Sequence, residues 1–500
     1  MIDVLLIHPP VDIEPKNVLK SLISPYLVGY GLLHIASYLK MMGYKVEVWN
    51  IPVAYAYGYN LEDIKALIKY HDPKLVGIEL NWLHFSNGSM ELVKVIKKIN
   101  PNIKIILGGV HATIFAEEII KNYPLIDAIF IGESEATILD YIQNLEKGLP
   151  LTEVPSCYIR NNDKIILNKN RKVLPIDEIP PYSLSIVKPK QKESFNIGTI
   201  NTTRGPCSGI CPYCIGSRKN YPLMIGSREK LELHSPEWIL EQLELLIKDT
   251  HNIAIQDYIY CAPKKHIMEI FNFLKNEKIT GLIEYFNIAG KPNSFDKETL
   301  SLMAKTGVDN IDYGVETGSN STLKILRRGY TAQQAVDTID LTVKCGILPK
   351  TYWMVGLPDE KDLSETKNLI KQTIEKGGFP RWVTPLIILP GTELFREAIK
   401  YHISIKMNTY NDFMKFSTTK INKNAWYPDV ITHTTNFMEI NDILKATNDL
   451  KDYILSFKEK IMSIFQKNLQ QYFNLHENVT SSLIMLRMKR ILSTLKYTLF

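Results

Sequence analysis

A strand, a turn and an amphipathic helix follow one another five times within residues 1–150. Short β-branched runs predict strands at 4–7, 45–49, 75–80, 104–107 and 128–131. Parallel strands need helical crossovers of this kind, so the alternation predicts an α/β fold with a doubly wound, Rossmann-like parallel sheet. Such sheets bind ligands at the carboxyl ends of their strands, so this domain is predicted to hold a cofactor.

A second series of strands and helices follows a proline-rich stretch at 151–195, which predicts a linker with a hairpin. Strands are expected near 198–203, 253–256, 282–288, 310–314, 350–355 and 382–388. These six βα units within 196–392 predict a partial (β/α)6 TIM-like barrel, with its chemistry at the carboxyl ends of the strands. Ser235 and Pro236 predict a helix start.

Residues 393–500 are expected to form a helical C-terminal domain, with helical patterns at 440–465 and 481–499. The stretch 483–492 is basic and amphipathic. It predicts either a helix that caps the barrel or one that contacts a membrane or an acidic protein.

Charge and cysteine content narrow the class of protein. The net charge is +6, but residues 451–500 hold eight Lys/Arg against three Asp/Glu, so the rest of the chain is nearly neutral and no nucleic-acid partner is expected. No run of about eighteen uncharged apolar residues occurs and the first residues lack signal-peptide features, so we expect no transmembrane segment and a cytoplasmic location. The six cysteines are unevenly distributed, with three clustered and three scattered, and do not resemble a disulfide framework. This pattern indicates a reducing compartment.

Three cysteines lie within eight residues: Cys207, Cys211 and Cys214. Three thiolates at this spacing suit three corners of an iron–sulfur cluster and leave the fourth iron open. A zinc site normally needs a fourth protein ligand from a second place in the chain, and His234 and His251 are isolated candidates for it. Zinc, or three unligated cysteines, remain the alternatives.

The loop resembles the motif of the radical S-adenosylmethionine (SAM) superfamily, in which an aromatic residue, here Tyr213, precedes the last cysteine. The resemblance implies a [4Fe–4S] cluster whose open iron binds SAM and cleaves it to a 5′-deoxyadenosyl radical, in an anaerobic cell. It also implies that Glu316 binds the ribose and that Gly356 lies at the adenine. Asp257 is the candidate for the methionine amino group, although the chain has Ile-Gln-Asp-Tyr-Ile-Tyr where the family often has Gly-Gly-Glu.

Residues 1–150 resemble the cobalamin-binding domain that is fused to many radical SAM enzymes. The similarity lies at the strand ends and implies these cofactor-binding residues: His8, Pro9, Trp82, Gly108, Gly109, His111, Gly132 and Glu133. The cobalt-ligating Asp-x-His-x-x-Gly motif of other cobalamin enzymes is absent. We therefore expect base-off, His-off cobalamin with Trp82 over its lower face, although His8 and His84 are possible axial ligands.

The resemblance implies a class B radical SAM C-methyltransferase, in which the radical abstracts a hydrogen from an unactivated carbon and methylcobalamin donates the methyl group. Tyr258, Tyr260 and Cys261 are candidates to face the substrate or to donate a proton or hydrogen atom. The substrate class stays open between a protein side chain, such as a residue of methyl-coenzyme M reductase, a lipid and a natural product. An external ferredoxin or flavodoxin is the expected electron donor. A cobalamin-dependent cyclase or rearrangement enzyme and a non-catalytic binding protein are the alternative functions.

Overall fold

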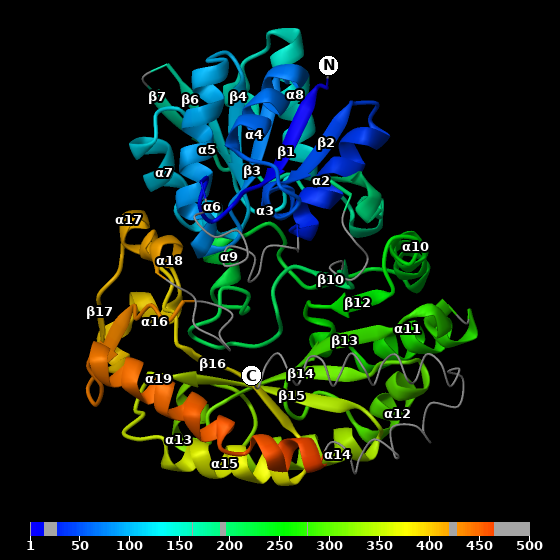
Figure 1. Cartoon of the computed structure of the whole chain (residues 1–500), viewed down its shortest axis with the longest axis vertical. Coiled ribbons are helices and arrows are strands. Elements are labelled where there is room, and N and C mark those ends of the chain that lie inside the picture. Colours follow the sequence, from blue (N-terminus) through cyan, green and yellow to red (C-terminus); the bar gives the residue numbers. More distant parts are fainter. Residues whose placement is uncertain are drawn as a thin grey trace. The chain divides into compact units, whose positions relative to one another are not determined.

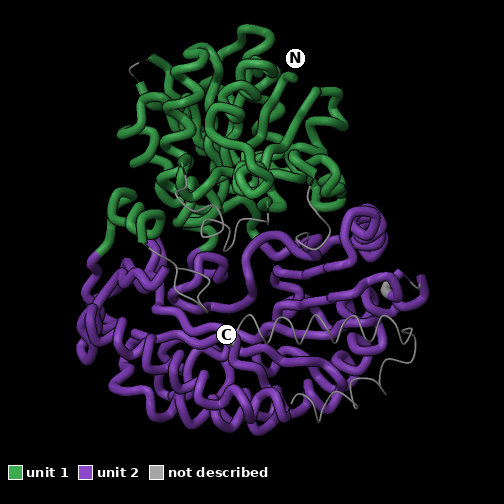
Figure 2. Tube along the Cα trace, viewed as in Figure 1, with its two compact units in different colours: residues 1–196, 221–229, 407–420 green, residues 197–220, 230–406, 421–500 purple. Residues whose placement is uncertain are grey.

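The computed structural model describes residues 2–14, 28–162, 164–190, 197–277, 279–419 and 428–464 (Figure 1). The chain divides into two compact units (Figure 2). Unit 1 comprises residues 1–196, 221–229 and 407–420, and unit 2 comprises residues 197–220, 230–406 and 421–500. Unit 1 thus includes two short segments that lie further along the chain than its first 196 residues.

Unit 1 is built on an eight-stranded sheet in the order β7-β6-β5-β4-β3-β1-β2-β8. The strands are β1 (Val4–His8), β2 (Val46–Asn50), β3 (Leu75–Glu79), β4 (Lys104–Gly108), β5 (Ala128–Phe130), β6 (Cys157–Asn161), β7 (Lys164–Asn168) and β8 (Val187–Lys188). The first five strands pair in parallel. Their side chains are almost all buried, which explains why these strands read as continuous apolar runs.

Unit 1 contains helices from three parts of the chain. They are α2 (Tyr30–Met41), α3 (Ile51–Ala56), α4 (Leu61–His71), α5 (Ser86–Ile99), α6 (Val110–Ile114), α7 (Ala116–Asn122), α8 (Glu135–Lys147), α9 (Tyr221–Met224), α17 (Tyr410–Phe413) and α18 (Lys415–Thr418). Helix α2 packs beside α8, and α4 packs beside α5. The chain runs from β1 toward one edge of the sheet and then returns past β1 to β3 and the other edge. Right-handed crossovers therefore place these two helix pairs on opposite faces of the sheet. The predicted doubly wound sheet is confirmed.

The stretch 151–190 extends this sheet at both of its edges. The hairpin of β6 and β7 adds antiparallel to β5, and β8 adds parallel to β2. These residues, expected to form a linker, therefore lie within unit 1.

Unit 2 contains a six-stranded sheet in the order β16-β15-β14-β13-β12-β9, in which every neighbouring pair is parallel. Its strands are β9 (Gly198–Ile200), β12 (Asn252–Ile255), β13 (Tyr285–Gly290), β14 (Asn310–Glu316), β15 (Leu348–Val355) and β16 (Phe379–Pro385). Sequential parallel order with a helix after each strand is that of an open barrel, so the predicted partial (β/α)6 fold is confirmed.

The helices of unit 2 follow these strands along the chain. They are α10 (Pro236–Leu246), α11 (Lys264–Asn276), α12 (Lys297–Lys305), α13 (Asn320–Ile325), α14 (Ala332–Lys344), α15 (Ser364–Glu375), α16 (Glu393–Arg396) and α19 (Ile440–Leu455). The predicted start of α10 is confirmed, because Ser235 Oγ accepts from the Trp238 amide at 3.3 Å.

Two short antiparallel ladders complete unit 2. They pair β10 (Thr203–Arg204) with β11 (Glu232–Leu233), and β17 (Ile403–Ile405) with β18 (His433–Thr435). The region after residue 393 thus combines helices with a two-stranded ladder. The predicted helix at 481–499, with its basic stretch at 483–492, and the last residue of the pattern at 440–465 lie outside the described residues.

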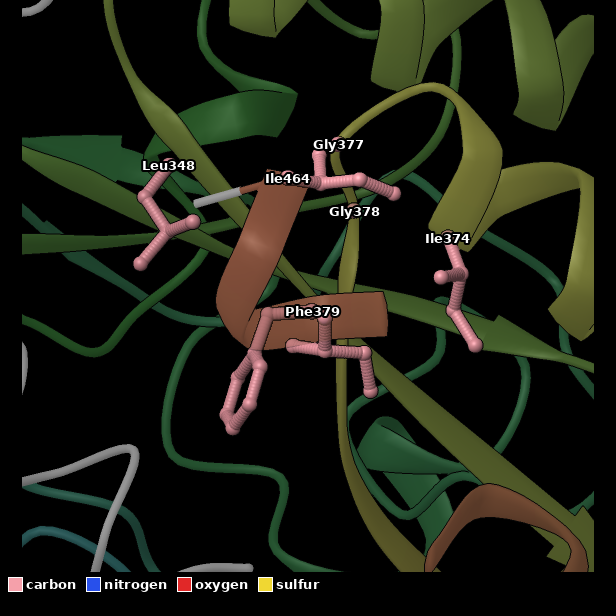
Figure 3. Close-up of a pocket in the computed structure, with 7 residues that line it drawn as sticks. Leu348, Ile374, Gly377, Gly378, Phe379 and Ile464 are labelled. Carbon is pink, nitrogen blue, oxygen red and sulfur yellow. The ribbon is translucent and has the colours of Figure 1, made fainter. Parts of the chain in front are cut away.

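A small apolar pocket lies where β15 and β16 begin (Figure 3). Its lining residues are Leu348, Ile374, Gly377, Gly378, Phe379, Ile461 and Ile464. Leu348 and Phe379 are the first residues of their strands, so the pocket is at the amino-terminal side of the barrel. That side carries packing in barrel folds, and the site must be sought at the carboxyl ends.

Within the described ranges, none of the helices has the length and apolar character that a membrane crossing requires.

Candidate functional site

The switch point of the unit 1 sheet lies between β1 and β3, and two buried polar side chains meet there. His8 ends β1, Glu79 ends β3, and His8 Nδ1 is 2.5 Å from Glu79 Oε1. The Gly29 amide donates to Glu79 Oε2 at 3.1 Å, which ties the start of α2 to the same carboxylate. Among the described residues, His8 Nε2 has no hydrogen-bond partner although it is buried. The neighbouring Pro9 is also buried.

Gly108, the last residue of β4, leaves open space at the sheet edge. A Cβ added to Gly108 would meet no atom within 4 Å. Gly109 has a φ of 108°, and the amide of Val110 donates to Asn81 Oδ1 at 3.1 Å. Trp82 follows Asn81 after β3 and is 42% exposed. An open backbone and an exposed indole at one sheet edge fit a large planar ligand such as a corrin.

Gly132 and Glu133, after β5, bind another part of unit 1. The Glu133 carboxylate accepts from Arg228 Nε and Nη2, both at 2.8 Å, and the Glu133 amide donates to Ser227 Oγ at 2.9 Å. The Arg228 side chain is almost fully buried, so this bidentate pair is a strong anchor. It holds segment 221–229 on the end of β5, a role the sequence did not indicate. The predicted cofactor contact of these two residues stays a prediction.

Replacing Gly132 by alanine is expected to lower the free energy of unfolding by about 3 kcal/mol. Its φ is +70°, and a Cβ there would overlap Ser227 Oγ. Gly148→Ala is the matched control, because Gly148 has a φ of +65° with nothing within 4 Å of its Cβ position. The control carries backbone strain alone, about 1 kcal/mol. Denaturant unfolding of both variants measures the difference, and equal losses would show that the contact with Ser227 contributes nothing.

His111, expected to bind the cofactor, lies inside an aromatic cluster. It is buried in α6, and its ring is 4.8 Å from the Phe115 ring and 5.6 Å from the Tyr410 ring, centroid to centroid. Tyr410 belongs to segment 407–420, so this segment covers α6. Burial, with the neighbouring His84, lowers the pKa of His111 to about 3. His111 is therefore neutral at physiological pH, and its role toward a cofactor stays a prediction.

Acidic pH is expected to lower the free energy of unfolding of unit 1 because His111 is buried and neutral in the folded chain. Its pKa is lowered from 6.5 on folding, so below pH 6.5 the unfolded chain takes up a proton that the folded chain does not. Stability therefore falls as the pH falls from 6.5 toward 3, by about 2 kcal/mol on reaching pH 5. His111→Phe keeps an aromatic ring and removes the titration, so its urea-unfolding free energy should fall less between pH 7 and 5. An equally steep fall in the variant would contradict the assignment.

The cysteine loop is held by its own backbone and by Asn220. The Cys207 amide donates to the Gly216 carbonyl at 2.7 Å, and Asn220 Nδ2 donates to the Cys214 carbonyl at 2.9 Å. Cys207 and Cys211 are each 8% exposed. A Cβ on Gly209 would lie 3.3 Å from Cys207 Sγ and 3.9 Å from Cys211 Sγ, so both sulfurs flank this glycine. Within the described part, no three His, Cys, Asp or Glu side chains cluster as a site for one metal ion.

Arg328 is the central group at the carboxyl end of β14. Its guanidinium lies 3.5 Å from Cys211 Sγ, 3.1 Å from the Tyr213 hydroxyl and 3.2 Å from Glu316 Oε1, and it donates to the Gly314 carbonyl at 2.7 Å. The Tyr213 hydroxyl also donates to Glu316 at 3.2 Å. Three predicted site residues thus meet around one buried cation. A cation beside a cysteine sulfur fits thiolates and a negatively charged cluster.

Glu316 and Gly356, at the ends of β14 and β15, have unusual backbones. Glu316 has a φ of 70° beside a register shift between β14 and β15, which points to a local constraint at this carboxylate. Gly356 has a φ of 79°, its amide donates to Glu360 at 2.8 Å, and its carbonyl accepts from His433 Nε2 at 2.7 Å. Burial raises the pKa of Glu360 to about 7. The ribose and adenine roles of Glu316 and Gly356 remain predictions.

Asp257 ties two loops together. Its carboxylate accepts from the Thr203 amide at 2.8 Å, the Ile259 amide at 2.9 Å and the Thr202 hydroxyl at 3.0 Å, and also from the Thr202 amide. Burial raises the pKa of Asp257 to about 6. Four donors of the chain itself occupy the carboxylate, so binding of the methionine amino group of SAM there stays a prediction.

All three predicted catalytic candidates lie against the segment that carries the cysteines. Cys261 Sγ is 3.2 Å from Cys207 Sγ, and the Tyr260 hydroxyl is 4.0 Å from the same sulfur. The hydrogen bond between the thiols raises the pKa of Cys207 and lowers that of Cys261 to about 6. The third, Tyr258, contacts the loop at Gly216, where a Cβ would overlap its hydroxyl.

Sequence reasoning missed Arg328, Ser227 and Arg228. Arg328 lies in the run Arg327-Arg328-Gly329-Tyr330, whose adjacent arginines directly after α13 were the available signal. Arg327 forms a different pair, with Glu393 Oε2 at 2.7 Å. Arg327 and Arg328 are thus adjacent in the chain but form ion pairs with different carboxylates.

Comparisons with known proteins match both halves of the chain. A family model described as a B12 binding domain matches residues 22–142, and one described as the radical SAM superfamily matches residues 200–372. An uncharacterized methyltransferase of Pyrococcus horikoshii is 27% identical over 415 residues, 81% of this chain and 85% of the relative. An anaerobic magnesium-protoporphyrin IX monomethyl ester cyclase of Rubrivivax gelatinosus is 22% identical over 386 residues, 74% of this chain and 65% of the relative.

Two solved structures share the fold. OxsB, a cobalamin-dependent S-adenosylmethionine radical enzyme, superimposes with a TM-score of 0.67 at 20% identity over 99% of this chain and 75% of its own. That structure contains aqua-cobalamin and S-adenosylmethionine. TsrM of Kitasatospora setae, a radical S-adenosylmethionine methyltransferase with cobalamin and a [4Fe–4S] cluster bound, has a TM-score of 0.65 at 14% identity. The match covers 89% of this chain and 90% of TsrM.

Proposed function

Because this chain belongs to the cobalamin-dependent radical SAM methyltransferases, we propose that it transfers a methyl group from cobalamin to an unactivated carbon of its substrate. The observation that carries the proposal is the group of contacts around Arg328, which joins the cysteine loop to Glu316. It supports a cluster and a SAM molecule bound side by side at the end of β14. When bound, the cluster supplies an electron for reductive SAM cleavage and the cobalamin carries the methyl group.

The chain's own residues hold these groups and exclude water. Cys207, Cys211 and Cys214 bind three irons, with Arg328 offsetting the negative charge of the Cys211 thiolate. Glu316 accepts hydrogen bonds from the SAM ribose while Tyr213 and Arg328 fix its orientation. Asp257 keeps the loop that precedes Cys207 in place through the amides of Thr202 and Thr203.

Unit 1 holds the cobalamin at the carboxyl edge of its sheet. The open backbone at Gly108 and the exposed Trp82 supply the surface against which the corrin packs. The proposed cofactor is base-off and His-off because the chain lacks the Asp-x-His-x-x-Gly motif; the hydrogen bond of His8 to Glu79 uses only Nδ1 of the ring. A ferredoxin or flavodoxin supplies the electrons, and the substrate is a protein side chain, such as a residue of methyl-coenzyme M reductase.

A second function, ring formation without methyl transfer, is favoured by one observation. A magnesium-protoporphyrin ester cyclase is 22% identical to 74% of this chain. The two functions differ in what becomes of SAM, because methyl transfer consumes one SAM as methyl donor and another as radical source.

The test is an anaerobic incubation of the protein, reconstituted with iron, sulfide and cobalamin, with SAM and dithionite. A methyltransferase yields 5′-deoxyadenosine together with S-adenosylhomocysteine, whereas a cyclase yields 5′-deoxyadenosine alone. Formation of neither product would overturn both proposals. The substrate is then sought by mass spectrometry of proteins from cells with and without the gene, as a peptide that is heavier by one CH2 group only when the gene is present.

A further inference from the structure

A fourth thiol lies in contact with the cysteine loop. Cys261 Sγ is 3.2 Å from Cys207 Sγ, and both are free cysteines. A disulfide bond has an S–S length of about 2.05 Å, so the sulfurs need to approach by only about 1 Å to be joined. Outside the loop, Cys157 Sγ contacts the Val154 carbonyl and Cys345 Sγ contacts the Ser301 hydroxyl.

The contact is fixed by hydrogen bonds on both sides. Asp257 accepts from the Thr203 amide, four residues before Cys207, and from the Ile259 amide, two residues before Cys261. The amide of Gly209 donates to Cys207 Sγ at 3.2 Å. One carboxylate thus holds both cysteine-bearing loops, and the two sulfurs meet as a consequence of that geometry.

The two thiols cannot both serve a cluster from these positions. Cysteines of a [4Fe–4S] cluster each bind a separate iron, which keeps their sulfurs apart, whereas these sulfurs touch. Cys207 therefore has two alternative partners, an iron atom or Cys261.

We propose that Cys207 and Cys261 form a reversible disulfide when the cluster is absent. While the disulfide is present, Cys207 cannot bind the cluster, and its sulfur is protected from irreversible oxidation. Reduction of the disulfide makes Cys207 available as a ligand again. The proposal rests on the proposed function only in taking Cys207 as a cluster ligand.

The oxidant is a small disulfide of the glutathione class. Cys261 is the more exposed of the two residues, so its thiolate attacks one sulfur of oxidised glutathione and releases one glutathione thiolate. Cys207 then loses its proton to solvent and attacks Cys261 Sγ, which releases the second glutathione. Two protein thiols are oxidised, and one small disulfide is reduced to two thiols.

The test treats the full chain, freed of iron by a chelator, with oxidised glutathione under nitrogen. After alkylation and digestion, mass spectrometry should find the peptides of Cys207 and Cys261 joined, lighter by two hydrogen atoms than the separate thiols. Cys261→Ser should lose this product, and Cys345→Ser, the matched control, should keep it. A bond from Cys207 to Cys211 or Cys214 in the wild-type protein would overturn the proposal.

A second readout follows iron uptake during reconstitution with ferrous iron and sulfide but no thiol reductant. Oxidised wild-type protein should take up little iron until dithiothreitol is added. The Cys261→Ser protein, treated in the same way and then freed of both free and bound glutathione, should take up iron without dithiothreitol. Equal iron uptake by oxidised and reduced wild-type protein would overturn the proposal that the disulfide withholds a cluster ligand. A cross-link in a protein that binds no iron even when reduced would support the disulfide and contradict the proposed function.

Discussion

Replacing Cys211 by alanine is expected to abolish the visible absorbance of a [4Fe–4S] cluster and all reductive cleavage of SAM. A cluster that keeps only two thiolates loses a corner and does not stay assembled. Cys211 is also the cysteine whose sulfur lies 3.5 Å from Arg328, so the change removes one contact of a buried guanidinium. Iron analysis, absorbance and production of 5′-deoxyadenosine measure the loss.

Cobalamin binding should survive this change. Cys211 belongs to unit 2, whereas the predicted cobalamin residues all lie in unit 1. Cys345→Ala is the matched control, because Cys345 is equally buried in unit 2 but its sulfur contacts Ser301 at 3.7 Å. The control should keep both cofactors. A Cys211→Ala protein that still cleaves SAM reductively would refute the assignment of this loop.

The elements that the sequence predicts well are those set by local periodicity. Strands β1 to β5 carry continuous apolar runs because both of their faces are buried, and helices between them have one apolar face, so their positions follow from the pattern. The barrel strands follow in the same way. The three cysteines stand out in the sequence because three thiols at this spacing suit an iron–sulfur cluster, and their role as ligands stays a prediction.

Contacts between distant residues were not predictable. Arg228 meets Glu133 across 95 residues, and Tyr410 contacts the ring of His111 across nearly 300. An arginine in a helix-flanking loop has the same local pattern whether it is exposed or buried against a carboxylate. The membership of 221–229 and 407–420 in unit 1 therefore depends on tertiary packing that no local signal carries.

Replacing Arg328 by methionine is expected to lower the free energy of unfolding of unit 2 by about 3–5 kcal/mol. The guanidinium is buried and pairs with Glu316 at 3.2 Å while it donates to the Gly314 carbonyl. Methionine preserves much of the volume but leaves a buried carboxylate without its cation, which costs more than the lost bonds themselves. Chemical denaturation of the cluster-free protein measures the change.

A double variant separates charge from packing. In Arg328→Met with Glu316→Gln the buried negative charge is gone as well, so part of the lost stability should return. The reconstituted Arg328→Met protein should also show a more negative cluster reduction potential, because the cation beside Cys211 favours the reduced, more negatively charged cluster. Arg328→Lys keeps the charge and should shift the potential less. A single Arg328→Met variant as stable as the wild-type chain would show that Glu316 does not depend on this cation.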